Sequence, residues 1–165
     1  MIMKTITMTL SGQSIDGAIK QLQAHKDSLQ EKARLICEKL AVTGAVQVSL
    51  RYASAIYTGR KDFNVTVEEI PNGYKILADG ETALILEFGA GVTYGYGHPQ
   101  ADEFGMGPGT YPDGKGHWND PNGWWIPKEH GGGHTYGNPP TMAMYETAKA
   151  LRERVLDVAR EVFNE

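Results

Sequence analysis

Residues 63–78 read FNVTVEEIPNGYKILA, two runs of alternating apolar and polar residues joined by Pro71-Asn72-Gly73. Alternation with a period of two places the apolar side chains on one face of a strand. The apolar members of the two runs are Phe63, Val65, Val67, Tyr74 and Ile76. We predict a β-hairpin here, closed by a turn in which Asn72 and Gly73 take positive φ values.

A long segment with one apolar face precedes the hairpin. Its apolar residues are Ile15, Ile19, Leu22, Leu29, Ala33, Ile36 and Leu40. Their spacing predicts an amphipathic helix from residue 14 to about residue 42, with Ser14 and Asp16 as candidate N-caps. Cys37 lies in this helix, where a packed thiol is the expected role. Gly44 interrupts the pattern, and residues 45–57 fit either a second helix or a strand.

The first residues of the chain alternate differently. In residues 2–10, Ile6, Met8 and Leu10 are apolar, and threonines occupy the odd positions 5, 7 and 9 between them. A period of two with β-branched residues on the other face predicts a half-buried strand.

Two further segments follow the hairpin. Residues 83–88 are almost wholly apolar and should be buried, as helix or strand, with Glu87 at the edge. After Pro139-Pro140, Thr141 can cap a terminal helix over residues 141–163. The expected buried face of that helix consists of Tyr145, Ala148, Leu151, Val155, Val158 and Val162.

These elements predict an α+β fold. A long N-terminal helix and a C-terminal helix would pack on a small antiparallel sheet, and the 165 residues fit a single domain, 1–165. Residues 89–140 would be a long loop inserted within it. This segment holds 14 of the 20 glycines, seven of the eight prolines and all three tryptophans. Loops of this length are usually functional or disordered.

Aromatic residues are the strongest functional signal in the loop, because aromatic side chains dominate buried contact area in protein interfaces. The candidates for a protein interface are Trp118, Trp124, Trp125, Tyr111 and Tyr136. Two other interpretations remain open. The rings can pack on the sheet of the same domain, or they can form a surface on which sugars stack.

The loop also holds four of the five histidines, and Glu129 precedes His130. His130 and His134 are four residues apart, but Gly131-Gly132-Gly133 between them disfavours the helix that would place both on one metal ion. We therefore expect no metal and no cofactor. A metal-dependent hydrolase or a glycan-binding module that uses this loop is the alternative function.

Composition narrows the function classes. The net charge is −4, and no segment clusters lysine and arginine as a row of phosphates would require, so we expect no nucleic-acid recognition. No run of residues reaches membrane-spanning length, and the first residues lack a secretory pattern. A single cysteine fits a reducing compartment. The expected location during synthesis is the cytoplasm.

Three short motifs lie at junctions of the predicted elements. They are Tyr57-Thr58-Gly59-Arg60 before a strand, Thr82-Ala83 followed by Leu86-Glu87-Phe88-Gly89-Ala90-Gly91, and Gly137-Asn138-Pro139-Pro140 before the last helix. Together they resemble motifs of the head-tail joining proteins of long-tailed bacteriophages, also called tail-completion or neck proteins. The first is similar to the family's Thr-Gly junction, the second to its Tyr-Ala and Val-Glu-Phe-Gly-Thr-Gly signature, and the third to the entrance to its last helix.

The resemblance implies an α+β virion protein of a phage or prophage, not an enzyme. Such a subunit would join copies of itself in a homo-oligomeric ring and contact a connector or tail-tube protein. Glu87-Phe88-Gly89 would form a structural corner before the loop. Residues 92–136 would form an arm that orders on a neighbouring subunit, which offsets the cost of ordering by burying aromatic area.

Overall fold

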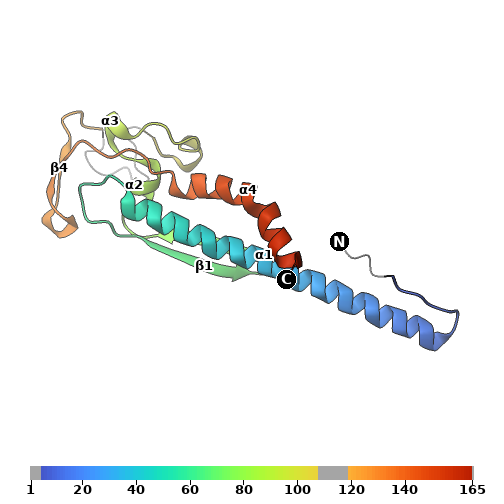
Figure 1. Cartoon of the computed structure of the whole chain (residues 1–165). Coiled ribbons are helices and arrows are strands. Elements are labelled where there is room, and N and C mark those ends of the chain that lie inside the picture. Colours follow the sequence, from blue (N-terminus) through green and yellow to red (C-terminus); the bar gives the residue numbers. More distant parts are fainter. Residues whose placement is uncertain (1–4, 108–118, 165) are drawn as a thin grey trace.

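The computed structural model describes residues 5–107 and 119–164 and has the expected α+β fold (Figure 1). Helices α1 (Gly12–Ser54) and α4 (Ala143–Asn164) pack against each other and on the hairpin of β1 (Asn64–Ile70) and β2 (Gly73–Asp79). The hairpin lies along the second half of α1, and the first half of α1 projects beyond the other elements.

Helix α1 is longer than the sequence predicted. Its N-cap is Ser11, whose hydroxyl accepts a hydrogen bond from the Ser14 backbone N–H, so the expected cap at Ser14 or Asp16 was wrong. The helix continues through Gly44, where the absence of a side chain lets Ile76 and Leu151 approach the backbone. The undecided segment 45–57 is therefore helix as far as Ser54.

The predicted N-terminal strand was wrong over its described part. Residues 5–9 have no regular structure, and residue 10 lies in a bend. The Thr9 backbone N–H donates to the Ser14 hydroxyl at 2.9 Å, which attaches this segment to the first turn of α1. Leu10 is exposed, and among the described residues no strand pairs with residues 5–10.

The hairpin is confirmed, with antiparallel pairs running from Asn64 and Asp79 to Ile70 and Gly73. Pro71 and Asn72 form its two-residue turn. Gly73 has a φ of 151°, but Asn72 is not among the described residues with positive φ, so that part of the prediction was wrong. The glycine alone provides the conformation that other residues rarely adopt.

The core lies where α1, the hairpin and the ends of α2 (Ala83–Phe88) and α4 meet. Its fully buried centre consists of Val48, Tyr52, Leu86 and Ala143. Residues 83–88, left undecided from the sequence, form a short helix and are largely buried, as expected. Glu87, expected at the edge of this segment, is itself buried near the end of α2.

Helix α4 confirms the predicted terminal helix but differs in its cap and its face. It begins after Met142, so Thr141 is not the cap. Val158 and Val162 are buried as predicted, whereas Ala148 and Val155 are exposed. Ala143 and Thr147 are buried instead, because α1 and the hairpin cover a narrower side of α4 than the apolar pattern suggests.

Residues 89–140 contain more regular structure than a loop. The described elements are α3 (Gly91–Tyr94), the 3₁₀ turns η1 (Asp102–Phe104) and η2 (Lys128–His130), and the paired strands β3 (Trp124–Ile126) and β4 (Gly133–Thr135). Ala90 and Asn138 pair as an isolated bridge, and Arg60 N–H donates to the His130 carbonyl at 2.7 Å. The described parts of the segment expected as an arm are thus folded onto the same chain.

Candidate interaction surface

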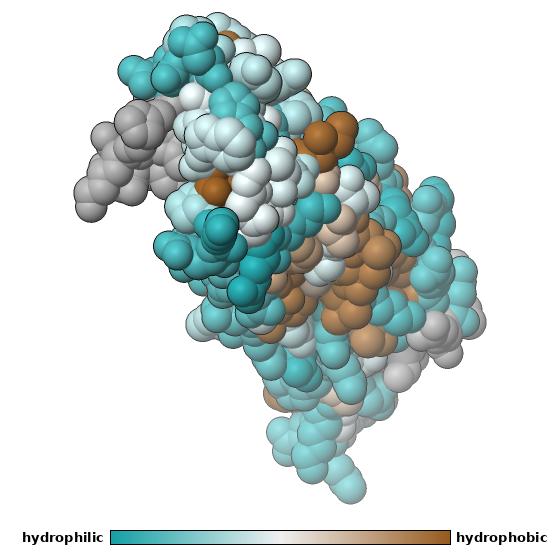
Figure 2. All heavy atoms as spheres, turned by 90° about the vertical axis from the view of Figure 1, so that its left-hand side faces the viewer, coloured by the Kyte–Doolittle hydropathy of each residue, from teal (hydrophilic) through white to brown (hydrophobic). Residues whose placement is uncertain are grey.

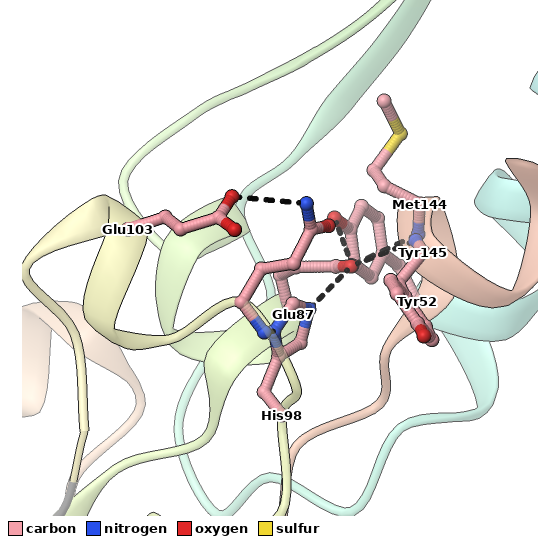
Figure 3. A network of polar contacts seen from close by, with 7 residues as sticks. Tyr52, Glu87, His98, Glu103, Met144 and Tyr145 are labelled. Carbon is pink, nitrogen blue, oxygen red and sulfur yellow. Dashed lines mark hydrogen bonds and ion pairs between the residues drawn. The ribbon is translucent and has the colours of Figure 1, made fainter.

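A buried carboxylate, that of Glu87, connects helices α1, α2 and α4. Glu87 on α2 accepts a hydrogen bond from the Tyr52 hydroxyl of α1 at 2.9 Å (Figure 3). Its oxygens also accept from the backbone N–H groups of Met144 at 2.9 Å and Tyr145 at 3.1 Å. The first-turn amides of α4 lack partners within the helix, so Glu87 takes the role that a cap side chain would have.

His98 adds the long segment to this junction. Its Nε2 lies 3.3 Å from Glu87 Oε1, and its Nδ1 accepts from the Gln100 backbone N–H at 3.1 Å. Because Nδ1 acts as an acceptor, we assign the ring proton to Nε2, which donates to Glu87. The imidazole also packs on Phe88, with ring centroids 4.2 Å apart.

Four donors therefore meet two carboxylate oxygens. Burial, and after it the negative charge of Glu87, raise the pKa of Tyr52 above its ordinary value, so the Tyr52 hydroxyl keeps its proton and remains a donor. Glu87 has little acceptor capacity left for a substrate. A cavity of about 510 Å³ adjoins Glu87 and His98, but the arrangement itself holds α1, α2, α4 and the long segment together.

The structure separates the two adjacent tryptophans that were predicted as interface anchors. Trp124 is half-buried and lines a cavity of about 260 Å³ with Tyr57 and Ile85. Trp125 is not among the residues that line that cavity and is 75% exposed. Trp124 therefore packs largely on its own chain, and Trp125 is available to another molecule.

Tyr136 joins Trp125 in an exposed row of rings. His134 lies between them, with ring centroids 5.3 Å from Trp125 and 5.0 Å from Tyr136, both edge to face. Tyr136 is 54% exposed. The two other predicted anchors, Tyr111 and Trp118, lie outside the described residues.

The described histidines of the long segment have separate surroundings. His130 Nδ1 lies 3.4 Å from the Glu81 carboxylate, His134 contacts Trp125 and Tyr136 edge to face, and His98 is bound at Glu87. Within residues 5–107 and 119–164 no three histidine, cysteine, aspartate or glutamate side chains are grouped as metal ligands would be. His117 lies outside the described residues.

A second exposed surface, which the sequence patterns did not indicate, lies on the part of α1 that projects (Figure 1). Lys32 Nζ donates to the Val162 carbonyl at 2.9 Å, so α4 ends beside Lys32. We call Gly12–Glu31 the tip of α1. Its large apolar side chains, here the tip stripe, are 38–57% exposed: Ile15, Ile19, Leu22 and Leu29.

The relative length of the two helices was the signal that could have revealed the tip. Helix α1 has 43 residues and α4 has 22. At about 1.5 Å per residue, α4 is roughly 30 Å shorter than α1. An apolar face that continues past the end of its covering helix must remain exposed or meet another molecule.

A third exposed group follows the outer side of α1 within the body of the molecule and ends just past the C-terminus of that helix. Its members, here the body stripe, are 53–75% exposed: Val42, Val46, Leu50 and Ile56. Figure 2 looks onto the end of the molecule where α1 stops and shows hydrophobic side chains gathered in one area of that face. Exposed apolar areas of this kind mark contact sites more often than isolated exposed residues do.

Comparison with known proteins identified no relative. No family model, no curated protein and no solved structure matches the chain. Among the described helices, none is long and apolar enough to cross a membrane.

Proposed function

We propose that this protein is a structural subunit of a phage or prophage virion that acts in head-tail joining or tail completion. The observation that carries the proposal is the tip of α1, a helix of about 20 residues that leaves the body with four large aliphatic side chains exposed. Helices gain most of their stability from packing an apolar face. A long helix with most of that face uncovered, Ala18 being its one buried position in the tip, is suited to assembly with another subunit.

The remaining surfaces support the same function. The exposed Trp125 and Tyr136 are residue types enriched at the centres of protein interfaces. The hydrogen bonds of Glu87 connect α1, α2 and α4 within the body that carries the tip and the aromatic row. The motifs from Tyr57 to Arg60 and from Thr82 to Gly91, which resemble head-tail joining proteins, lie at the end of α1 and at this junction.

The expected partners are other copies of the chain in a ring and a connector or tail-tube protein, and the expected location is the virion. A tagged chain, produced in the strain that carries the gene, tests this location. After induction, the tag should sediment with tailed particles in a density gradient, and deletion of the gene should leave filled heads separate from tails. Complete particles from the deletion strain would contradict the proposal.

A metal assay on the purified chain addresses the alternative function. A hydrolase that uses the histidine-rich segment requires a bound metal ion, and its activity should disappear after His130→Ala or His134→Ala. The assembly function requires neither result. Normal particle assembly with the His130→Ala/His134→Ala chain would support the structural function.

A further inference from the structure

Two separate aliphatic surfaces lie along α1, and the second extends two residues past the end of the helix at Ser54. The tip stripe is Ile15, Ile19, Leu22 and Leu29, and the body stripe is Val42, Val46, Leu50 and Ile56. Each contains four large aliphatic side chains, and each covers 15 positions of the chain. The two surfaces are therefore matched in length and in chemistry.

The stripes face different directions. The tip stripe continues the face of α1 that packs on α4 further along, where Leu40 and Cys37 line a groove with Leu151 and Val155. At about 100° per residue, Val46 lies roughly 120° around the helix from Leu22. One straight partner helix cannot cover both stripes of the same copy.

We propose that the tip stripe of one copy packs on the body stripe of the next copy, in a head-to-tail contact. A two-fold contact between two tips would leave both body stripes exposed. A head-to-tail contact covers both stripes with one kind of interface, and such an interface generates a closed ring or a continuing filament. This inference rests on the proposed function, because it names the surfaces through which the subunits join.

The size of the contact fits assembly of many copies. A tip of about 20 residues is about 30 Å long and about 10 Å wide, which gives roughly 300 Å² per partner. Stable pairs of proteins usually bury about 800 Å² per partner. A single contact is therefore weak, and ring closure stabilises it because every copy then makes two.

Cross-linking in the full-length chain tests the contact. The native thiol is removed by Cys37→Ser, and Leu22→Cys and Val46→Cys are introduced in separate chains. With a flexible bis-maleimide, a mixture of the two variants should give a covalent pair that contains one chain of each, while each variant alone should not. One chain with both changes should give a ladder that extends beyond the dimer.

A control variant is available in the same helical turn. Ala24 is exposed on the other side of the tip, so Ala24→Cys mixed with Val46→Cys should give little product. Cross-linking of Leu22→Cys with itself would overturn the inference in favour of a tip-to-tip dimer. An oligomer without any cross-link between positions 22 and 46 would also overturn it and leave the proposed function intact, whereas a strict monomer would contradict the proposed function itself.

Discussion

The carboxylate of Glu87 joins four parts of the chain. It can accept hydrogen bonds from all of them because it is charged. The amides of Met144 and Tyr145 carry partial positive charge at the start of α4, and a carboxylate satisfies them better than a neutral side chain does. We expect Glu87→Gln to lower the free energy of unfolding by about 2–4 kcal/mol. Urea titration measures this loss.

Glu81→Gln is the matched control for that substitution. Glu81 is exposed and pairs with the exposed His130, so its replacement should cost less than about 1 kcal/mol. Equal losses for the two variants would mean that Glu87 is not the junction described above.

Tyr52 should make stability depend on alkaline pH. Its pKa is raised in the folded state by burial first and by Glu87 second, so its contribution is fully present below the unfolded pKa of about 10 and is lost above it. The free energy of unfolding should fall from about pH 10 upward. Subtracting the same titration of Tyr52→Phe isolates this residue, and parallel curves for the two proteins would argue against the assignment.

Gly89 adopts a conformation that the corner before the long segment requires. Its φ is 77°, and an added Cβ would lie 2.8 Å from the Asn138 carbonyl oxygen and from the Pro140 nitrogen. Gly89→Ala should therefore destabilise the fold by more than about 1 kcal/mol. Gly17→Ala, in open space on α1, should stabilise it slightly, and thermal melting compares the two.

At the scale of elements, the neighbouring residues Trp124 and Trp125 of strand β3 have different roles. Trp124→Ala should destabilise the monomer by about 1–3 kcal/mol because the ring is half-buried, whereas Trp125→Ala should leave stability nearly unchanged and weaken assembly. Chemical denaturation and sedimentation of both variants test this division. If Trp125→Ala destabilised the monomer and Trp124→Ala did not, the two assignments would be reversed.

The sequence predicted the elements whose patterns are local. The hairpin around Pro71 and the terminal helix follow from periods of two and 3.6, and both are confirmed. Residues 45–57 stayed undecided because Gly44 is a poor helix former, yet its packing on Ile76 and Leu151 outweighs that preference. The strand expected at residues 2–10 failed because alternation cannot show whether a neighbouring strand exists.

The candidate surface was less predictable, because it depends on distant parts of the chain. Trp124 and Trp125 are adjacent, and only the pairing of β3 with β4 shows which of them faces the cavity. Glu87 gave no local sign that it caps α4, since its partners are more than 50 residues away. The tip was missed because its exposure depends on where α4 ends.

At the scale of the whole molecule, the central claim is that the projecting tip of α1 makes this chain an assembly subunit. The most direct test is the mass of the full-length protein across concentration by analytical ultracentrifugation, with Leu22→Asp beside Ala24→Asp. Both changes add one negative charge to the same turn, but only Leu22 belongs to the tip stripe. We predict that the native chain and Ala24→Asp form larger assemblies as concentration rises and that Leu22→Asp remains a folded monomer. Equal assembly by Leu22→Asp and the native chain, or a native chain that stays monomeric at every concentration, would contradict the account.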